Sequence, residues 1–369
     1  MRATRAIIHL DNLKNNIRII KNHLPPGIKI CLAIKADAYG HGAKEVAKVA
    51  LDERIDSLGV ATADEGRELR QAGINIPIIL LSLPIPEEIP GIIKDHLVPV
   101  VASIKLIHLL SKEGKKQEKP VTVHLKIDTG MGRIGCTPSE SVKLAEEIIQ
   151  SPFLKLGGVC THFPCADKKA GQSTDSQITL FRRSIENILK KGINPGIKHT
   201  ANSGAIIALP ESYFDMVRPG IIAYGYYPSK EQERILPLKP VMELRTKIVF
   251  LKKVPEGSTI SYGMTYRTKQ ETWIATIPIG YGDGYSRLLS GKAEVLIKGK
   301  RYPLVGTICM DQCMIDLGPQ TDIKLFDEVS LFGPDKTGPD AEVIADIIGS
   351  IPYEVTCLVS KRVPRVYKE

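Results

Sequence analysis

The chain has 369 residues, of which 43% are hydrophobic and 25% are charged, a composition typical of a globular protein with a full core. A chain of this length holds two domains, or one large barrel with an addition. Its net charge of +9 comes from scattered basic residues that are not interleaved with aromatic ones, which argues against a nucleic-acid-binding surface.

The first element with a chemical signature is IKICLAIKADAYGHG, residues 28–42. Its apolar first half is short and has no helical period, so it predicts a buried strand that ends at Lys35. Desolvation there would lower the pKa of the ammonium group and leave a nucleophilic amine, as a Schiff-base enzyme requires. Tyr39 adds a phenol, and Gly40 and Gly42 let the backbone approach a ligand closely. A strand-end lysine that merely reaches solvent is the alternative.

Apolar runs and amphipathic helical patterns alternate through the first part of the chain. The expected strands are residues 28–35, 57–61, 77–82, 98–102, 121–128, 156–163, 197–203 and 216–221. Eight strand–helix units in roughly 200 residues are typical of a closed parallel barrel of the TIM type, (β/α)8. A doubly wound open sheet is the competing topology, and periodicity alone does not exclude it.

The pattern changes near residues 228–240, and β-rich runs separated by glycine and proline turns follow. They cover residues 242–254, 259–262, 272–279, 293–297, 302–309 and 328–332. We therefore expect an α/β fold with a barrel domain, residues 1–232, and a mostly β domain, residues 233–369. Residues 1–10 are strand-like but have no place among the eight barrel strands, so they are a candidate to pair with the second domain.

Polar side chains recur where the expected barrel strands end, which is where barrel enzymes carry their sites. In chain order they are Lys35, Arg133, His162, Asn202, Ser203, Arg218 and Gly220. Singly, each has a simpler explanation: His162 could be a core histidine, and Ser203 could only cap a helix that begins at Gly204. Together, a strand-end lysine and a phosphate-like cradle after strands 7 and 8 are what a pyridoxal phosphate barrel needs.

The seven cysteines are odd in number and form no CxxC pair. Their spacing fits neither common zinc motifs nor redox motifs, so we expect free thiols and no metal. The N-terminal sequence MRATRAIIHLDNLKNN has an apolar segment too short for a signal peptide, and no run approaches the length of a membrane span. These features predict a cytoplasmic protein.

From its first helix to its C-terminus the chain resembles alanine racemase, a family of fold-type III pyridoxal 5'-phosphate enzymes. The barrel motifs are AIKADAYGHG around Lys35, KIDTGMGRIG through Arg133, THF at His162, HTANSG at Asn202 and Ser203, and VRPGI at Arg218. The second-domain motifs are SYGMTY at Tyr262, PIGYGDGY at Tyr281, CMD at Met310 and Asp311, and PYEVTC at Tyr353.

The resemblance implies interconversion of L-alanine and D-alanine by two-base exchange of the α-proton, which supplies D-alanine for peptidoglycan. Lys35 would hold the cofactor as an internal aldimine and then act as the base for the D-enantiomer. Tyr262 would act on the opposite face as the base for the L-enantiomer. It is expected from the second subunit, so the site exists only in a homodimer.

The resemblance also implies roles for the remaining site residues. Arg133 would meet the substrate carboxylate and the cofactor's phenolic oxygen, steadied by Lys126, which maps to a carbamylated lysine in relatives. His162 and Arg218 would help Tyr262 to act as a base, through hydrogen bonds, and Arg218 would also face the pyridine nitrogen. Met310, beside Asp311, would offer its backbone N–H to the carboxylate. The phosphate would lie among Tyr39, Ser203, Gly220, Ile221 and Tyr353, with Asn202 also at the cofactor, while Tyr281 and Tyr353 would narrow the entrance.

The chain departs from the family pattern at Asp37, where many relatives have asparagine, and at Thr307, where arginine is common. Because of the change at Thr307, the sequence does not establish whether charge steers the substrate at the entrance. Three alternatives remain: a broad-specificity amino-acid racemase, a decarboxylase of the same fold type, and a non-catalytic pyridoxal phosphate carrier on a lone barrel. A second domain that carries Tyr262 argues against the carrier.

Overall fold

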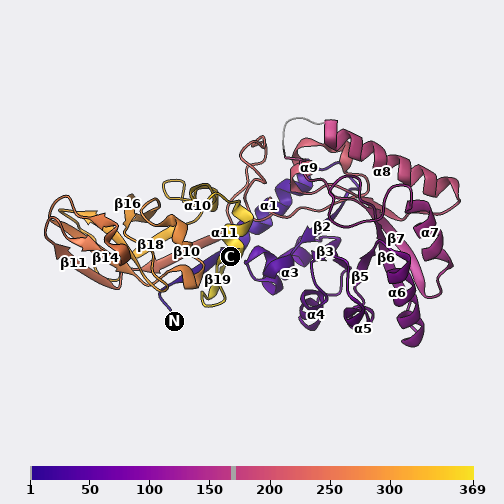
Figure 1. Cartoon of the computed structure of the whole chain (residues 1–369), viewed down its shortest axis with the longest axis horizontal. Coiled ribbons are helices and arrows are strands. Elements are labelled where there is room, and N and C mark those ends of the chain that lie inside the picture. Colours follow the sequence, from indigo (N-terminus) through magenta and orange to yellow (C-terminus); the bar gives the residue numbers. More distant parts are fainter. Residues whose placement is uncertain (1, 168–171) are drawn as a thin grey trace.

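A computed structural model describes residues 2–167 and 172–369, and the chain divides into two parts (Figure 1). A barrel surrounded by helices lies on one side of the view, and a large, mostly antiparallel sheet lies on the other. Helix α1 and the C-terminal elements α10, α11 and β19 lie between them.

The barrel is closed by eight parallel strands in chain order, with the last strand paired to the first. The strands are β2 (Lys29–Ala33), β3 (Ser57–Val60), β4 (Ile78–Leu80), β5 (Val98–Val101), β6 (Val121–Lys126), β7 (Leu154–Cys160), β8 (Ile197–His199) and β9 (Met216–Val217). The predicted (β/α)8 barrel is confirmed, and the open doubly wound sheet is wrong. Strands such as β3 and β4 are buried along their whole length, as expected where helices cover the outside of a parallel sheet.

Helix α1 (Leu10–His23) precedes the first barrel strand, and further helices return the chain between the barrel strands. They are α2 (Lys35–Tyr39), α3 (Ala43–Asp52), α4 (Ala63–Gln71), α5 (Ile89–Lys94), α6 (Ile104–Lys116), α7 (Ser141–Gln150), α8 (Gln172–Lys190) and α9 (Ser203–Ala208). Helix α4 shows why they form where they do: the Thr62 side chain accepts from the Glu65 N–H in a capping box, and Leu69 lies on the buried face.

The last two barrel strands are shorter than the sequence predicted. The expected strands 197–203 and 216–221 end at His199 and Val217, and Pro219, which has no N–H to donate, follows soon after the second. The residues released from the strands form loops at the mouth of the barrel, and these loops carry the polar side chains that the sequence singled out.

The second part is mostly β, as predicted. Its nine-stranded sheet has the order β11-β14-β17-β16-β15-β18-β10-β1-β19, and β12 pairs separately with β13. Its elements are β10 (Met242–Lys247), β11 (Phe250–Val254), β12 (Thr259–Ile260), β13 (Tyr266–Arg267), β14 (Thr272–Ile277), β15 (Glu294–Ile297), β16 (Lys300–Val305), β17 (Cys313–Gly318), β18 (Glu328–Phe332), α10 (Ala341–Ile348), α11 (Pro352–Leu358) and β19 (Arg365–Lys368).

The first strand of the chain belongs to this sheet. Strand β1 (Arg5–His9) pairs antiparallel with β10 and parallel with β19, and its central residues 6–8 are buried. The chain therefore begins in the sheet, passes through the barrel and returns to the sheet, so that both ends of the sequence lie on neighbouring strands.

Within the described residues, no helix is long and apolar enough to cross a membrane. The same residues contain no cluster of three or more histidine, cysteine or acidic side chains that could hold a metal ion.

Candidate active site

A cavity of about 420 Å³ opens at the carboxyl ends of the barrel strands. Its lining brings together many of the polar residues that the sequence predicted: Lys35, Tyr39, Lys126, Arg133, His162, Asn202, Ser203, Arg218 and Gly220 from the barrel, and Tyr353 from α11. Residues more than 300 positions apart in sequence thus share one space, because α11 contacts α2 at the mouth of the barrel.

Lys35 lies just beyond β2, at the start of a left-handed turn. Residues 36–39 all have positive φ angles, between 52° and 55°, a backbone conformation that costs free energy for residues other than glycine. The Ala36 N–H donates to the Glu65 carboxylate at 2.7 Å, and the Gly40 N–H donates to the Ala36 carbonyl at 2.9 Å. The surrounding contacts thus hold a strained backbone that directs Lys35 and Tyr39 to the same cavity.

The Lys35 amine is in an environment that favours its neutral form. Partial burial is the main cause that lowers its pKa, and the nearby positive charge of Arg133 lowers it further. The lowered pKa increases the fraction of amine that can act as a nucleophile or accept a proton.

Ser203, Gly220 and Tyr39 form a small polar cradle at one end of the cavity. The Gly220 N–H donates to Ser203 Oγ at 2.9 Å, and a Cβ added at Gly220 would lie 2.6 Å from the Tyr39 hydroxyl. Any other residue at this position would collide with the Tyr39 hydroxyl, so glycine allows two hydroxyl groups and a backbone N–H to lie together where a small anionic group could approach them.

Ser203 is not the helix cap that the simpler interpretation required. The N-cap of α9 is Asn202, whose Oδ1 accepts from the Ala205 N–H at 3.1 Å and whose amide donates to the Phe163 carbonyl at 3.0 Å. The Ser203 hydroxyl is thereby left to face the cavity and Gly220.

Arg218 is a buried cation, only 7% exposed, beside the cavity. It donates to the carbonyls of Thr161 and Thr200 at 2.8 and 2.9 Å, to His199 Nδ1 at 2.9 Å, and to His162 Nδ1 at 3.3 Å. Burial and the Arg218 charge lower the pKa of His162 to about 2, so His162 is neutral at physiological pH.

A line of two histidines, which the sequence did not single out, supports Arg218 from inside the barrel. Because Arg218 can only donate, His199 Nδ1 must accept, and its Nε2 must carry the hydrogen donated to His124 Nδ1, 2.9 Å away. Burial lowers the pKa of both histidines, that of His124 to about 4, so this arrangement of neutral rings persists at physiological pH. His199 lies in the HTANSG motif and His124 lies two residues before Lys126, but only the closed barrel shows that they meet.

We expect His199→Leu to lower the free energy of unfolding by about 3 kcal/mol, because Nη1 of the buried Arg218 cation would then lose its acceptor. Urea unfolding followed by circular dichroism measures the change. His199→Gln is the matched control, since its amide can accept from Arg218 and donate to His124. An equal loss in both variants would contradict the assigned hydrogen bonds.

The DTGMGR turn holds Arg133 over the cavity. Asp128 Oδ1 accepts from the N–H groups of Gly130, Met131 and Gly132 at 2.9 to 3.2 Å, and both glycines have positive φ. The turn therefore needs these glycines for its conformation. Below it, Lys126 is buried, and desolvation lowers its pKa to about 8.

Other predicted site residues lie elsewhere in the same chain. Ile221 is fully buried behind the cradle, whereas Tyr262 is 72% exposed and Met310 is 52% exposed on the second part. Tyr262 and Tyr281 line a separate cavity of about 540 Å³ with Arg287, Ile308 and Cys309. Asp311, next to Met310, forms an ion pair with Arg362.

Thr307, at the position where arginine is common in relatives, is buried and supports the loop that carries Tyr262. Its hydroxyl donates to the Tyr262 carbonyl at 2.9 Å, and the Ser261 hydroxyl donates to the Thr307 carbonyl at 2.5 Å. In this chain the side chain therefore contributes to the backbone geometry around Tyr262 and carries no charge at the entrance.

Comparisons with known proteins agree over the whole chain. The family models for the alanine racemase N-terminal and C-terminal domains match residues 8–228 and 241–367. The chain is 50% identical to the alanine racemase of Treponema denticola, with 100% of this chain and 98% of the relative covered.

Solved structures give the same result. The structure of alanine racemase from Clostridium difficile 630 is 44% identical, with a TM-score of 0.95 and 100% and 96% of the two chains covered. That of alanine racemase from Bacillus anthracis with bound L-Ala-P is 37% identical, with a TM-score of 0.94 and the same coverage.

Proposed function

The chain belongs to the alanine racemase family, and we propose that it interconverts L-alanine and D-alanine with pyridoxal 5'-phosphate as its cofactor. The observation that carries the proposal is the single cavity in which Lys35, Arg218 and the cradle of Ser203 and Gly220 lie together. We propose peptidoglycan synthesis as the use of the D-alanine product.

The residues of the cavity fit the cofactor at both ends. A phosphate group suits the cradle, where the hydroxyls of Tyr39 and Ser203 and the backbone around Gly220 converge and a side chain at residue 220 would collide with the Tyr39 hydroxyl. At the other end, Arg218 is held by acceptors on two carbonyls and two histidines. A fixed guanidinium there would donate to the ring nitrogen and disfavour its protonation, which limits side reactions.

When bound to Lys35, pyridoxal phosphate supplies an electron sink that makes the α-hydrogen of alanine acidic. The Lys35 amine, with its pKa lowered by burial and by Arg133, would take or return that proton on one face of the substrate. Arg133 would hold the substrate carboxylate, because a guanidinium binds a carboxylate with two parallel hydrogen bonds.

Inversion requires a second base on the opposite face of the substrate, and we propose that this base is the partner's Tyr262 in a homodimer. Within one chain, Tyr262 lies outside the Lys35 cavity and is largely exposed. Phe250, Met264, Tyr281 and Met310 are exposed on the same part of the chain, and apolar side chains of this kind suit a subunit interface. The partner's Met310 N–H would then meet the substrate carboxylate, and the partner's Tyr281 would narrow the entrance.

Lys126 lines the same cavity as Arg133, and we propose that it steadies that residue. Its buried amine, with a pKa of about 8, is partly neutral at physiological pH and could add carbon dioxide with loss of one proton. The resulting carbamate would be an anion beneath Arg133, and we propose this modification by analogy with relatives.

The experiment that tests the function is racemisation of L-alanine in deuterium oxide by the purified protein, followed by circular dichroism and mass spectrometry. We expect the optical signal to decay to zero while deuterium enters the α-position, because inversion exchanges that hydrogen with solvent. Serine and lysine are the controls: rates near that of alanine would instead favour a broad-specificity racemase. No change in a protein that shows bound cofactor absorbance would contradict the proposal.

A further inference from the structure

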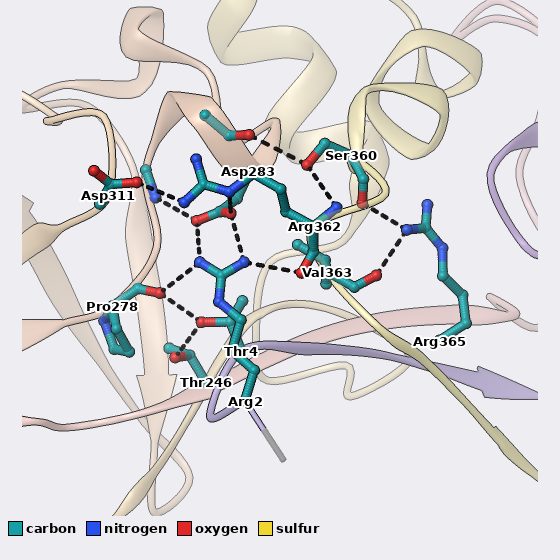
Figure 2. A network of polar contacts seen from close by, with 12 residues as sticks. Arg2, Thr4, Thr246, Pro278, Asp283, Asp311, Ser360, Arg362, Val363 and Arg365 are labelled. Carbon is teal, nitrogen blue, oxygen red and sulfur yellow. Dashed lines mark hydrogen bonds and ion pairs between the residues drawn. The ribbon is translucent and has the colours of Figure 1, made fainter.

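Away from the Lys35 cavity, a buried carboxylate joins distant segments of the chain (Figure 2). Asp283 is fully buried, and its two oxygens accept from the two terminal nitrogens of Arg2 at 2.6 and 2.7 Å. Arg362 Nε lies 3.4 Å from the same carboxylate, and Arg362 Nη2 donates to Asp311 at 2.6 Å. These four residues are called the Asp283 clamp below.

The buried carboxylate of Asp283 requires partners, because a buried carboxylate is destabilising unless cations and hydrogen bonds surround it. The two parallel bonds from Arg2 fix the carboxylate in direction as well as position. Arg2 also donates to the carbonyls of Arg362 and Pro278, and Thr4 donates to the same Pro278 carbonyl at 2.7 Å. The clamp thus connects the start of the chain to the segment after α11 and to the loop that follows β14.

Two loops depend on this carboxylate: one carries Tyr281, which is predicted to narrow the entrance, and the other carries Met310, which is predicted to contact the substrate. Asp283 is the last residue of the short helix Tyr281–Asp283. Two hydrogen bonds join this helix to the loop that carries Met310: the Tyr281 N–H donates to the Cys309 carbonyl at 3.1 Å, and the Gly282 N–H donates to the Met310 carbonyl at 2.9 Å. A Cβ at Gly282 would lie 2.5 Å from Arg362 Nη1, so the guanidinium lies directly against the loop backbone. Tyr281 and Met310 are themselves exposed, and the clamp holds the backbone beneath them.

We propose that the Asp283 clamp positions Tyr281 and Met310 for the substrate entrance of the partner subunit. The inference rests on the proposed function, because it uses the shared sites of the homodimer. Asp283, Arg2 and Arg362 are positioning residues: they act on the substrate through the two loops. Loss of the clamp should weaken substrate binding in the partner's cavity, while the cofactor-binding residues of the barrel remain in place.

Arg362→Gln is the first test, since Arg362 is half-exposed and its loss leaves no cavity in the core. We expect the KM for L-alanine to rise about tenfold, with kcat changed less than about twofold and cofactor absorbance unchanged. Lys361→Gln is the matched control, because it removes the same charge from the exposed neighbouring position and should change nothing. An unchanged KM in Arg362→Gln, or a fall in kcat alone, would overturn the proposal.

Hybrid dimers show in which site the clamp acts. When Arg362→Gln and Lys35→Ala are on one chain and the other chain is wild-type, the intact Lys35 faces the altered loops, and the KM should be raised. When the two substitutions are on different chains, the intact Lys35 faces wild-type loops, and the KM should be normal. Equal KM values in the two hybrids would contradict the proposal that the clamp of one subunit affects substrate binding in the partner's cavity.

Hydrogen exchange separates failure of the clamp from failure of the proposed function. Arg362→Gln should speed amide exchange at Tyr281 and Gly282 more than tenfold, whatever the protein catalyses, because the loop pairing would open more often. Unchanged exchange would overturn the clamp. Faster exchange in a protein whose wild type leaves alanine unchanged would support the clamp and reject the racemase.

Discussion

Lys35→Ala should give a folded protein that has lost cofactor absorbance and has less than about 10⁻⁴ of wild-type turnover, because the substitution removes the proposed nucleophile and base together. Lys35 is partly exposed at the mouth of the barrel, so its truncation should leave the core intact. Absorbance spectroscopy, alanine racemisation and circular dichroism measure the three properties.

Two comparisons make this test specific to Lys35. Lys44→Ala removes an exposed lysine from the neighbouring helix α3 and should keep both absorbance and turnover. A small added amine such as methylamine should restore part of the proton transfer in Lys35→Ala. Normal absorbance and turnover in Lys35→Ala would show that the cofactor is held elsewhere.

Tyr262→Phe should keep the cofactor bound while racemisation falls about 10³-fold, the range lost when a positioned acid–base group is removed. Only the hydroxyl is deleted, so the exposed loop and its contacts with Thr307 should persist. Lys35 should still exchange the α-hydrogen of D-alanine with deuterium oxide, so exchange without inversion is the expected signature. Mass spectrometry and chiral chromatography measure it.

The control for this variant is Tyr266→Phe, which removes another hydroxyl of the same segment, one that donates to Asp316. It should leave racemisation within about twofold of wild type, since an exchange of this kind away from the site has a small effect. Mixing Tyr262→Phe with Lys35→Ala chains should restore activity in the hybrid dimer, where one intact Lys35 meets the partner's Tyr262. Near-normal racemisation by Tyr262→Phe alone would remove the two-base assignment.

Much of the architecture could be predicted from local pattern. A short apolar run precedes Lys35, and similar runs recur along the chain with amphipathic helices between them. This pattern predicts parallel strands whose outer faces are covered by helices, and eight such units predict the closed barrel that the structure shows. The run 242–254 was harder, because it contains two strands, β10 and β11, that lie far apart in the order of the sheet. Very short strands such as β13 carry too few residues for a period to be visible.

The sequence by itself determined which residue types follow the barrel strands, because the apolar run of a strand and the polar residues after it are local in sequence. It did not determine the length of the last two strands, which are shorter than the apolar pattern predicted. Only the tertiary structure decided how these residues meet. The left-handed turn after Lys35, the line from Arg218 through His199 to His124, and the Asp283 clamp each join residues whose geometry depends on distant backbone. Their hydrogen bonds form only after the barrel and the sheet have closed, and no local propensity encodes contacts between residues 2 and 283 or 124 and 199.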